Sequence, residues 1–214
     1  DKYDLMNDFM SLGIHRLWKK DLIMMMSPYT NKKLIDVGCG TGDIGQLFLN
    51  TVKFKGSVYN VDPNKKMLDQ GKKRFKNVDN ISWHIGNAEN LKFKSNFFDY
   101  YTISFGLRNT KDISKSLKEA YRVLKPGGRF LCLEFSKISN SNLNFLYKNY
   151  SKIIPKVGKL IVGKSEPYEY LIKSIDKFIN QNQLVELMNK NGFENCKYRD
   201  LSGGIVSIHS GWKV

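Results

Sequence analysis

The chain has 214 residues, of which 41% are hydrophobic, and it carries a formal net charge of +15. This length and composition predict one globular domain with a complete core. No apolar run is long enough to cross a bilayer, so we expect no membrane span. The three cysteines, Cys39, Cys132 and Cys196, are far apart, and their odd number and spacing argue against a disulfide framework or a metal site. The chain begins with Asp1 rather than Met, which leaves room for a targeting segment upstream.

The positive charge is spread along the sequence. Lysine pairs occur at 19–20, 32–33 and 65–66, and a basic triplet occupies 72–74. No RNA-binding motif with paired aromatic residues accompanies them, so we expect no nucleic-acid partner. The scatter favours a solvated surface, with weak association with an anionic membrane as the alternative. The three histidines are far apart and match no metal motif, so we also expect no metal.

Two helical patterns precede the first strand. Apolar residues recur at helical spacing over 3–10, and a second helical pattern runs over 16–26. A helical pair before the first strand commonly covers the ligand pocket of an α/β domain. We therefore expect residues 1–30 to form an N-terminal helical cap.

The next stretch predicts a strand, a glycine-rich turn and a helix. An apolar run at 34–37 ends at Gly38, Gly40 and Gly42, and a helical pattern occupies 44–51. Glycines let the backbone turn tightly and let a ligand approach it closely. The helix that follows offers unpaired N–H groups and a positive dipole end. The stretch is therefore typical of a nucleotide-type site, and the alternative is a glycine turn without a ligand.

Two acidic residues decide which ligand this turn favours. Asp43 stands where a dinucleotide fingerprint would place its third glycine, and Asp36 lies in the strand before the turn. Their carboxylates would repel a pyrophosphate and attract a cation. S-adenosylmethionine carries an ammonium and a sulfonium, and the segment resembles the first motif of class I methyltransferases. We expect Gly38 and Gly40 to contact this cofactor.

A second strand, predicted over 56–62, ends in Asp62, twenty positions after Gly42. An acid at about this distance commonly accepts hydrogen bonds from ribose hydroxyls. We therefore predict that Asp62 is the ribose ligand, and the alternative is a turn or N-cap acid before Pro63. Asn87 follows the next strand, where open α/β sheets bind ligands, and either Asn87 or the backbone next to it is a candidate for contacting the adenine.

The remaining elements follow in order. We predict helices at 64–75, 112–124 and 181–191, strands at 81–85, 97–105 and 129–135, a helical lid insertion at 136–180, and a hairpin of strands at 193–199 and 205–212. The sequence 125–128, Lys-Pro-Gly-Gly, should end the second of these helices sharply. The predicted fold is α/β, a Rossmann-like class I methyltransferase domain over 1–214. Its seven-stranded, mostly parallel sheet ends in a C-terminal antiparallel hairpin and carries helices on both faces.

Several segments together resemble one family. The sequence over 3–213 is similar to the ubiquinone/menaquinone biosynthesis C-methyltransferases, and the segments that carry the resemblance are 3–8, 12–19, 86–89, 105–109, 119–128 and 203–211. The resemblance implies S-adenosylmethionine-dependent methylation of a polyprenyl benzoquinol ring carbon in ubiquinone synthesis, without a metal. It also implies a set of cofactor contacts: Thr41, Asp62, Asn87, Ala88 and Ser104. Gly163-Lys164 departs from the family, in which an acid often follows the glycine.

Methylation of a ring carbon needs a quinol whose hydroxyl loses its proton, because phenolate charge delocalises onto the ring. Arginine is a poor base, so we expect Arg108 to stabilise the phenolate or to orient a water that takes the proton. Asn109 would hold a ring oxygen. The alternative is a loop salt bridge and a turn cap. Substrate-binding candidates on the N-terminal cap are Tyr3, Asn7 and Asp8.

The expected substrate tail and the basic charge favour peripheral attachment to an anionic membrane. The resemblance implies the matrix side of the mitochondrial inner membrane in a eukaryote and the cytoplasm in a bacterium. It also suggests a quinone-biosynthesis complex and a homodimer. Alternative functions are a demethylmenaquinol methyltransferase, a methyltransferase for RNA or another small molecule, and a non-catalytic scaffold of a quinone-synthesis complex.

Overall fold

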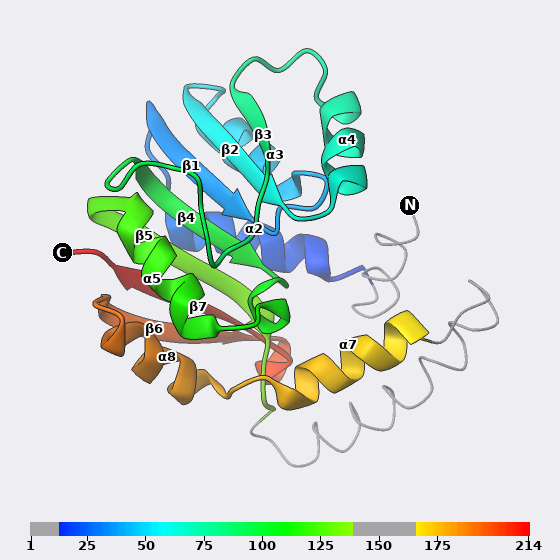
Figure 1. The fold of residues 1–214 in the computed structure, drawn as a ribbon, viewed down its shortest axis with the longest axis vertical. Helices are drawn as coiled ribbons and strands as arrows, with labels where there is room; N and C mark the ends of the chain where they lie inside the picture. Colours follow the sequence, from blue (N-terminus) through cyan, green and yellow to red (C-terminus); the bar gives the residue numbers. More distant parts are fainter. Residues whose placement is uncertain (1–12, 139–165) are drawn as a thin grey trace.

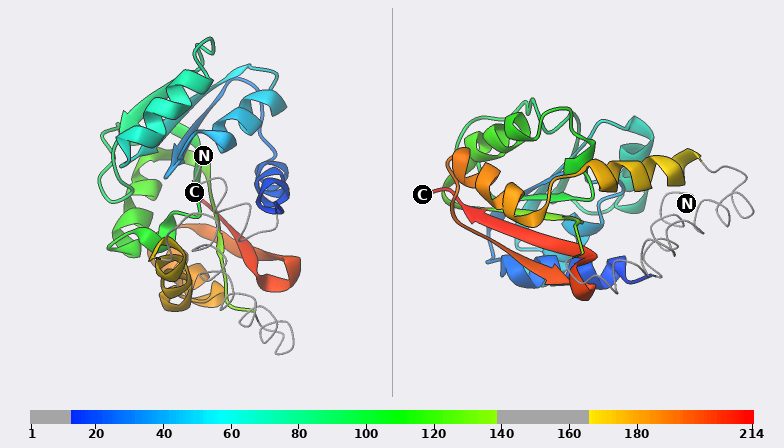
Figure 2. Two further views of the ribbon diagram at one scale, coloured as in Figure 1. Left: turned by 90° about the vertical axis from the view of Figure 1, so that its right-hand side faces the viewer. Right: turned by 90° about the horizontal axis from the view of Figure 1, so that it is seen from below.

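Seven strands form the central sheet of the computed structural model, which describes residues 13–138 and 166–214. The strand order is β3-β2-β1-β4-β5-β7-β6. Neighbours among β1 to β5 pair in parallel, whereas β7 is antiparallel to both β5 and β6. Helices α2 and α3 cover one face, and α5 and α8 cover the other (Figures 1 and 2). The predicted α/β fold, with its C-terminal antiparallel hairpin, is confirmed.

The strands are β1 Lys32–Val37, β2 Gly56–Asp62, β3 Ile81–Ile85, β4 Phe98–Ser104, β5 Leu124–Phe135, β6 Glu194–Leu201 and β7 Val206–Trp212. The α-helices are α2 His15–Met26, α3 Asp43–Thr51, α4 Lys65–Arg74, α5 Ile113–Val123, α7 Glu166–Lys177 and α8 Gln181–Lys190. Two short 3₁₀ turns are η1 Leu107–Asn109 and η2 Ser202–Gly204. The helix predicted over 3–10 and the part of the predicted lid over 139–165 lie outside the described residues.

Side-chain caps start several of these helices. The Asn64 side chain accepts a hydrogen bond from the Lys66 N–H at the start of α4, and Asp112 accepts from the Lys115 N–H at the start of α5. At α8, Asn180 and Gln183 form a reciprocal capping box. Each cap satisfies an N–H group that the helix itself leaves unpaired, which explains why the helices begin at these residues.

The start of β5 differs from the prediction. The strand was expected over 129–135, but it begins at Leu124, which pairs with Phe98 directly after α5 ends. The register shifts before the next pair, and Gly127 has a φ of +75°. The Gly127 N–H donates to the Lys213 carbonyl, and the Lys213 N–H donates to the Gly128 carbonyl. The Pro-Gly-Gly sequence therefore forms an irregularity inside the strand, because glycine can take the left-handed backbone that such a bulge needs.

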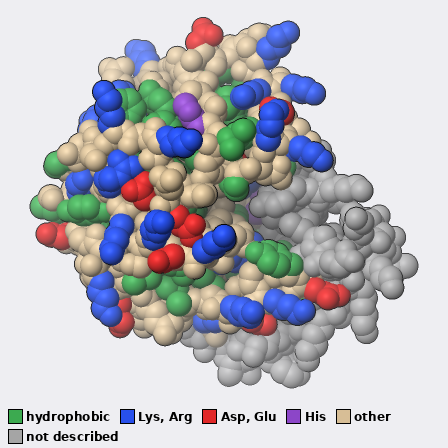
Figure 3. Space-filling model, in the orientation of Figure 1, with side chains coloured by type: hydrophobic (Ala, Val, Ile, Leu, Met, Phe, Trp, Pro, Cys, Tyr) green, Lys and Arg blue, Asp and Glu red, His purple; other side chains and the backbone are tan. Residues whose placement is uncertain are grey.

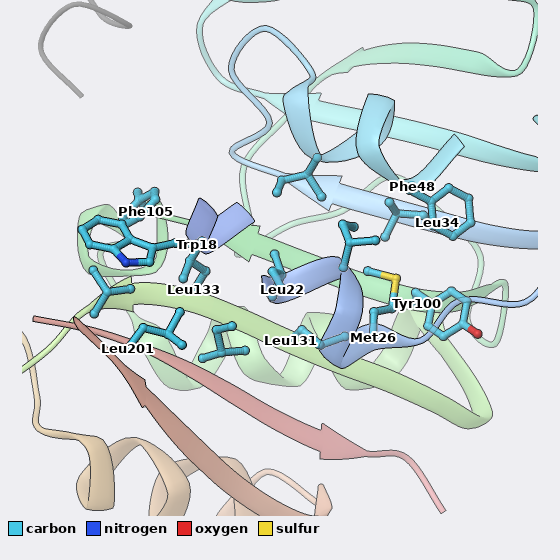
Figure 4. Packing of buried hydrophobic residues seen from close by; sticks show 14 of the residues in the cluster. Trp18, Leu22, Met26, Leu34, Phe48, Tyr100, Phe105, Leu131, Leu133 and Leu201 are labelled. Carbon is cyan, nitrogen blue, oxygen red and sulfur yellow. The ribbon is translucent and has the colours of Figure 1, made fainter. Parts of the chain in front are cut away.

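Each face of the sheet has its own hydrophobic cluster. Trp18, Leu22 and Met26 of α2 pack against Leu131 and Leu133 of β5 on one face (Figure 4). On the other face, a second set of buried side chains joins α5 and α8 to the strands: Ile35, Tyr101, Leu117, Ala120, Phe130, Leu184 and Met188. Two covered faces explain why the central strands are apolar nearly throughout.

Helix α2 is held at both ends. Near its start, the Trp18 Nε1–H donates to the Ser202 hydroxyl at 2.9 Å. At its end, the buried Arg129 guanidinium donates to the carbonyls of Met25 and Met26, which the helix leaves unpaired. Arg129 Nε also donates to Ser210 on β7 at 2.8 Å. These contacts fix where the side chains of α2 stand relative to the sheet.

Lys and Arg side chains are spread over the face seen in Figure 3 rather than gathered in one area. Among residues 13–138 and 166–214, no helix has the length and apolar character to cross a membrane. The same residues hold no cluster of three or more His, Cys, Asp or Glu that could bind a metal. All three cysteines are free; Cys132 is buried, and Cys39 and Cys196 are half-buried.

Candidate cofactor and active site

A cavity of about 400 Å³ opens beyond the carboxyl ends of β1, β2 and β4. Its wall contains all seven residues predicted to bind the cofactor, Gly38, Gly40, Thr41, Asp62, Asn87, Ala88 and Ser104, and also Asn109. The carboxyl ends of parallel strands share one edge of the sheet, which brings these distant positions together. Their contact with the cofactor remains a prediction.

The glycine turn is built as the sequence predicts. Gly38, Gly40 and Gly42 have φ angles of +67°, +56° and +88°, which side-chain-bearing residues rarely adopt. The N–H groups of Gly38 and Cys39 both donate to the Val61 carbonyl, which fastens the turn to β2. A Cβ atom on Gly42 would lie 2.6 Å from the Trp83 ring, so this position has no room for a side chain.

Asp62 joins the turn to the next strand. One carboxylate oxygen accepts from the Gly40 N–H at 2.9 Å, and the other accepts from the Asn64 N–H at 2.8 Å. Burial raises the pKa of Asp62, while these two hydrogen bonds oppose the rise. Asp62 also lines the cavity, and each carboxylate oxygen has a further lone pair that can accept from a hydroxyl. Asp62 thus serves as the turn acid that the alternative interpretation named, and it stays available to a ribose.

Asp36 is the buried acid of the cavity. Its side chain is almost fully buried, and Oδ1 accepts from the Thr102 hydroxyl of β4 at 2.8 Å. Burial raises its pKa to about 7, and the Thr102 hydrogen bond and the charge of Lys19 lower it in part. Asp36 Oδ2 and the Ser104 hydroxyl are both buried and find no hydrogen-bond partner among the described residues. Two such atoms on one cavity wall indicate a polar ligand.

Asp43 does not carry the role that the sequence suggests. Its carboxylate pairs with the Lys19 ammonium at 2.8 Å and with the Arg74 guanidinium. Burial alone would raise the pKa of Asp43, but these two cations outweigh it and lower the pKa. Asp43 is therefore neutralised within the protein. The other acidic residues of the cavity wall are Asp36, Asp62 and Glu89, and Asp36 is the most deeply buried of them.

Arg108 and Asn109 are neighbours in sequence but face different surroundings. The Arg108 guanidinium donates to Glu134 at 2.7 Å, to the Phe105 carbonyl at 2.6 Å and to the Ser174 hydroxyl at 3.2 Å. Its side chain is 7% exposed, and it is not part of the cavity wall. Asn109 lines the cavity, and its Oδ1 accepts from the Tyr170 hydroxyl at 3.2 Å. Within the short turn η1, the Arg108 side chain is therefore buried in the protein, and the Asn109 side chain lines the cavity.

Comparison with known proteins settles the family. The model of the ubiE/COQ5 methyltransferase family matches residues 1–213. The chain belongs to this family. The ubiquinone/menaquinone biosynthesis C-methyltransferase UbiE of Rickettsia bellii is 49% identical over 221 residues, which cover 100% of this chain and 89% of that protein. The mitochondrial 2-methoxy-6-polyprenyl-1,4-benzoquinol methylase of Dictyostelium discoideum is 45% identical and covers 99% of this chain and 78% of that protein.

Solved structures agree on the fold. A methyltransferase from Thermotoga maritima, described as S-adenosylmethionine-dependent, superposes with a TM-score of 0.70 at 22% identity and covers 99% of this chain and 95% of that one. Membership of the ubiE/COQ5 family confirms the resemblance seen in the sequence. It also confirms the predicted enzyme class, an S-adenosylmethionine-dependent C-methyltransferase of ubiquinone/menaquinone biosynthesis.

The cavity suits the cofactor of this family. Its volume lies in the range of small-molecule sites. Asp36 can accept from a cationic group, Ser104 can donate or accept, and Asp62 can accept from hydroxyls. The sheet order β3-β2-β1-β4 sets Asn87, Asp62, the glycine turn and Ser104 along one line.

Two residues of the site were not predicted from the sequence. Lys19 reaches the cavity from α2, and Glu134 pairs with Arg108 from the end of β5. Lys19 lies inside the 12–19 segment that carries the family resemblance, which is the signal that could have pointed to it. No local pattern marks Glu134. The predicted substrate ligands Tyr3, Asn7 and Asp8 lie outside the described residues.

Proposed function

We propose that this chain methylates a ring carbon of a polyprenyl benzoquinol. The observation that carries the proposal is one cavity wall that joins the predicted cofactor ligands to Asn109. The full-length similarity to a benzoquinol methylase and to ubiquinone/menaquinone methyltransferases supports the choice of acceptor. The methylation of demethylmenaquinol is the second candidate, because the names of the bacterial relatives include menaquinone biosynthesis.

At the cofactor end, each predicted contact has a chemical reason. Asp62 accepts from the ribose hydroxyls, and Asn87 with Ala88 contacts the adenine. Gly38 and Gly40 have no side chains, so the cofactor can approach their main chain closely. Thr41 and Ser104 supply hydroxyls on the wall, and the Asp36 carboxylate faces the cationic part of the ligand. When bound, S-adenosylmethionine supplies an electrophilic methyl group.

At the acceptor end, Asn109 is set to donate. The Tyr170 hydroxyl donates to Asn109 Oδ1, which leaves the amide NH₂ group to donate to a ring oxygen of the quinol. Such a donor stabilises the phenolate that makes the ring carbon nucleophilic. The Arg108 guanidinium is already held by Glu134 and Phe105, so we assign it the role of positioning η1 and Asn109. Tyr3, Asn7 and Asp8 stay proposed substrate ligands.

The deciding experiment is methyl transfer from labelled S-adenosylmethionine to a short-tailed methoxy-benzoquinol, with demethylmenaquinol alongside. We expect faster transfer to the benzoquinol. The reverse preference would establish the menaquinone reaction, and cofactor binding without transfer to either quinol would support a scaffold. Asn109→Ala should lower turnover without weakening cofactor binding. Asn189→Ala, at an exposed position of α8, is the matched control.

We also propose peripheral attachment to an anionic membrane. Four large apolar side chains are 50% to 73% exposed on or near α2 and the end of α3: Leu17, Met24, Tyr29 and Phe54. Exposed lysines accompany them at Lys20 and Lys53. Met24 and Lys20 also line a groove between α2 and α3. Exposed apolar side chains together with exposed lysines suit an anionic bilayer surface.

Sedimentation with phosphatidylglycerol vesicles tests this attachment. Binding should fall with added salt and in Met24→Ser. Ile85→Ser changes a similarly exposed apolar position on β3 and should bind as the unaltered protein does. Salt-independent binding, or an equal loss of binding in both variants, would contradict the proposal.

The mitochondrial inner membrane, or the cytoplasm of a bacterium, is the proposed location. A quinone-biosynthesis complex and a homodimer remain proposals, and light scattering measures the dimer directly.

A further inference from the structure

Lys19 is a cavity residue that the proposed reaction has not yet used. It projects from α2 onto the cavity wall, and its side chain is only 12% exposed. The wall also contains Lys111, but that residue is exposed. Lys19 is therefore the more buried cation on the described part of the wall, and burial of a charge needs a partner.

The position of Lys19 follows from the sheet order. Along β3-β2-β1-β4, the adenine contact Asn87 follows β3, and the ribose contact Asp62 ends β2. The amino-acid end of S-adenosylmethionine then falls beyond the ends of β1 and β4. Trp18, the neighbour of Lys19, packs against Phe105 just after β4, with ring centroids 6.2 Å apart. Lys19 therefore lines the part of the cavity where the predicted contacts would place the amino-acid end of the cofactor.

The hydrogen-bonding capacity of Lys19 is only partly used. Its ammonium donates to Asp43 at 2.8 Å, and an ammonium has three donors. Asp43 also forms an ion pair with the Arg74 guanidinium, which supplies a second positive charge. Asp43 therefore remains paired if Lys19 turns one or more donors toward a ligand. The ligand group that a lysine favours there is an anion, and the anionic group of S-adenosylmethionine is its carboxylate.

We propose that Lys19 binds the carboxylate of the S-adenosylmethionine amino-acid group. This inference rests on the proposed cofactor site, and it adds a contact from α2 to those made by the sheet edge. It also gives α2 a part in cofactor recognition, since Trp18 and Arg129 hold the helix that carries Lys19. Asp36 Oδ2, which has no hydrogen-bond partner among the described residues, would accept from the ammonium of the same amino-acid group.

The test compares two ligands that differ only in the carboxylate. Calorimetry measures the Kd of S-adenosylmethionine and of decarboxylated S-adenosylmethionine for the full chain and for Lys19→Met, which keeps an apolar stem and loses the charge. We expect Lys19→Met to weaken S-adenosylmethionine binding about tenfold or more and to leave the decarboxylated ligand within about twofold. Lys19→Arg should retain most of the affinity. Lys20→Met, at the exposed neighbouring position, is the control.

Other outcomes overturn the inference. Equal weakening of both ligands by Lys19→Met would mean that Lys19 acts only through Asp43, and unchanged affinity for both would mean that it does not contact the cofactor. Thermal unfolding of each variant excludes a folding defect, and Lys19→Arg covers the case in which Lys19→Met does not fold. If the unaltered chain binds S-adenosylmethionine but methylates no quinol, the proposed acceptor fails and the Lys19 contact stands. If it does not bind the cofactor, both fail.

Discussion

The Arg108 guanidinium lies 2.7 Å from the Glu134 carboxylate, and the two side chains are 7% and 1% exposed. Removal of one partner leaves the other charge buried and unpaired. We expect Arg108→Ala and Glu134→Ala each to lower the free energy of unfolding by about 3–5 kcal/mol, measured by urea denaturation. Lys65→Ala, which breaks the exposed Lys65–Asp69 pair, is the control and should change stability little.

The same pair separates two roles for Arg108 in turnover. If Arg108 positions η1, then Arg108→Lys and Glu134→Gln should both lower kcat and leave cofactor affinity unchanged, because both loosen the turn that carries Asn109. If Arg108 instead contacts the quinol, Glu134→Gln should keep far more activity than Arg108→Lys. We expect the first result in steady-state assays at saturating S-adenosylmethionine.

Gly40 and Gly127 form a matched pair for the glycine turn. Both have positive φ, at +56° and +75°, so alanine at either position should cost about 1–2 kcal/mol of stability. Gly40 lines the cavity, whereas a Cβ on Gly127 meets nothing within 4 Å. Gly40→Ala should therefore weaken cofactor binding about tenfold or more, and Gly127→Ala should not. If calorimetry gave equal cofactor affinities for Gly40→Ala and Gly127→Ala, the glycine turn would not be part of the cofactor site.

Asp36 should make cofactor affinity depend on pH. Burial raises its pKa to about 7, and Lys19, Asp43 and Asp62 are the charged neighbours that influence it. A cationic ligand favours the ionised carboxylate, so affinity should rise as the pH increases from 6 to 8. In Asp36→Asn the affinity should be lower, and this rise should be absent. A rise that persists in the variant would assign the titration to another group.

Asp36 also affects folding with a defined sign. Its pKa in the folded protein exceeds the ordinary carboxyl value of 3.8, so the fold favours the protonated form and loses stability as the pH rises from about 4 to 7. Asp36→Asn should therefore be more stable than the unaltered protein at pH 8, as measured by thermal unfolding without cofactor. A stabilised variant that binds the cofactor poorly is the expected signature of a binding residue.

His209 should make the fold sensitive to acid. It is buried on β7, its Nε2 lies 3.1 Å from the Gln181 carbonyl, and burial lowers its pKa to about 4. The unfolded chain binds a proton near pH 6.5, so stability should fall as the pH drops from 6.5 toward 4, by up to about 3 kcal/mol. His209→Gln should reduce this dependence in thermal unfolding scans. His84→Gln, at a half-buried position, should reduce it less.

Local sequence was sufficient for much of the site. Apolar runs predict the parallel strands, and the glycines after β1 predict a turn that does adopt positive φ. Asp62, Asn87 and Ser104 meet at one cavity because residues that follow parallel strands share an edge of the sheet. This inference needs only the element order, which hydrophobic periodicity reveals. The same reasoning predicts that Asn109, which follows β4, lies near the reacting groups, and Asn109 does line this cavity.

Only the tertiary structure shows which charged side chains that are distant in sequence form ion pairs with one another. Asp43 looked like a charge for the ligand, but Lys19 from α2 and Arg74 from α4 neutralise it. Arg108 is predicted from the sequence to stabilise the phenolate or to orient a water, and the structure shows it in a buried ion pair with Glu134, outside the described cavity wall. A buried charged side chain pairs with an opposite charge close to it, and the packing of separate helices and strands determines which residue supplies that charge. The sequence by itself determined the fold, the family and the edge at which chemistry occurs, and only the packed structure decided which of the charges there remain free to act.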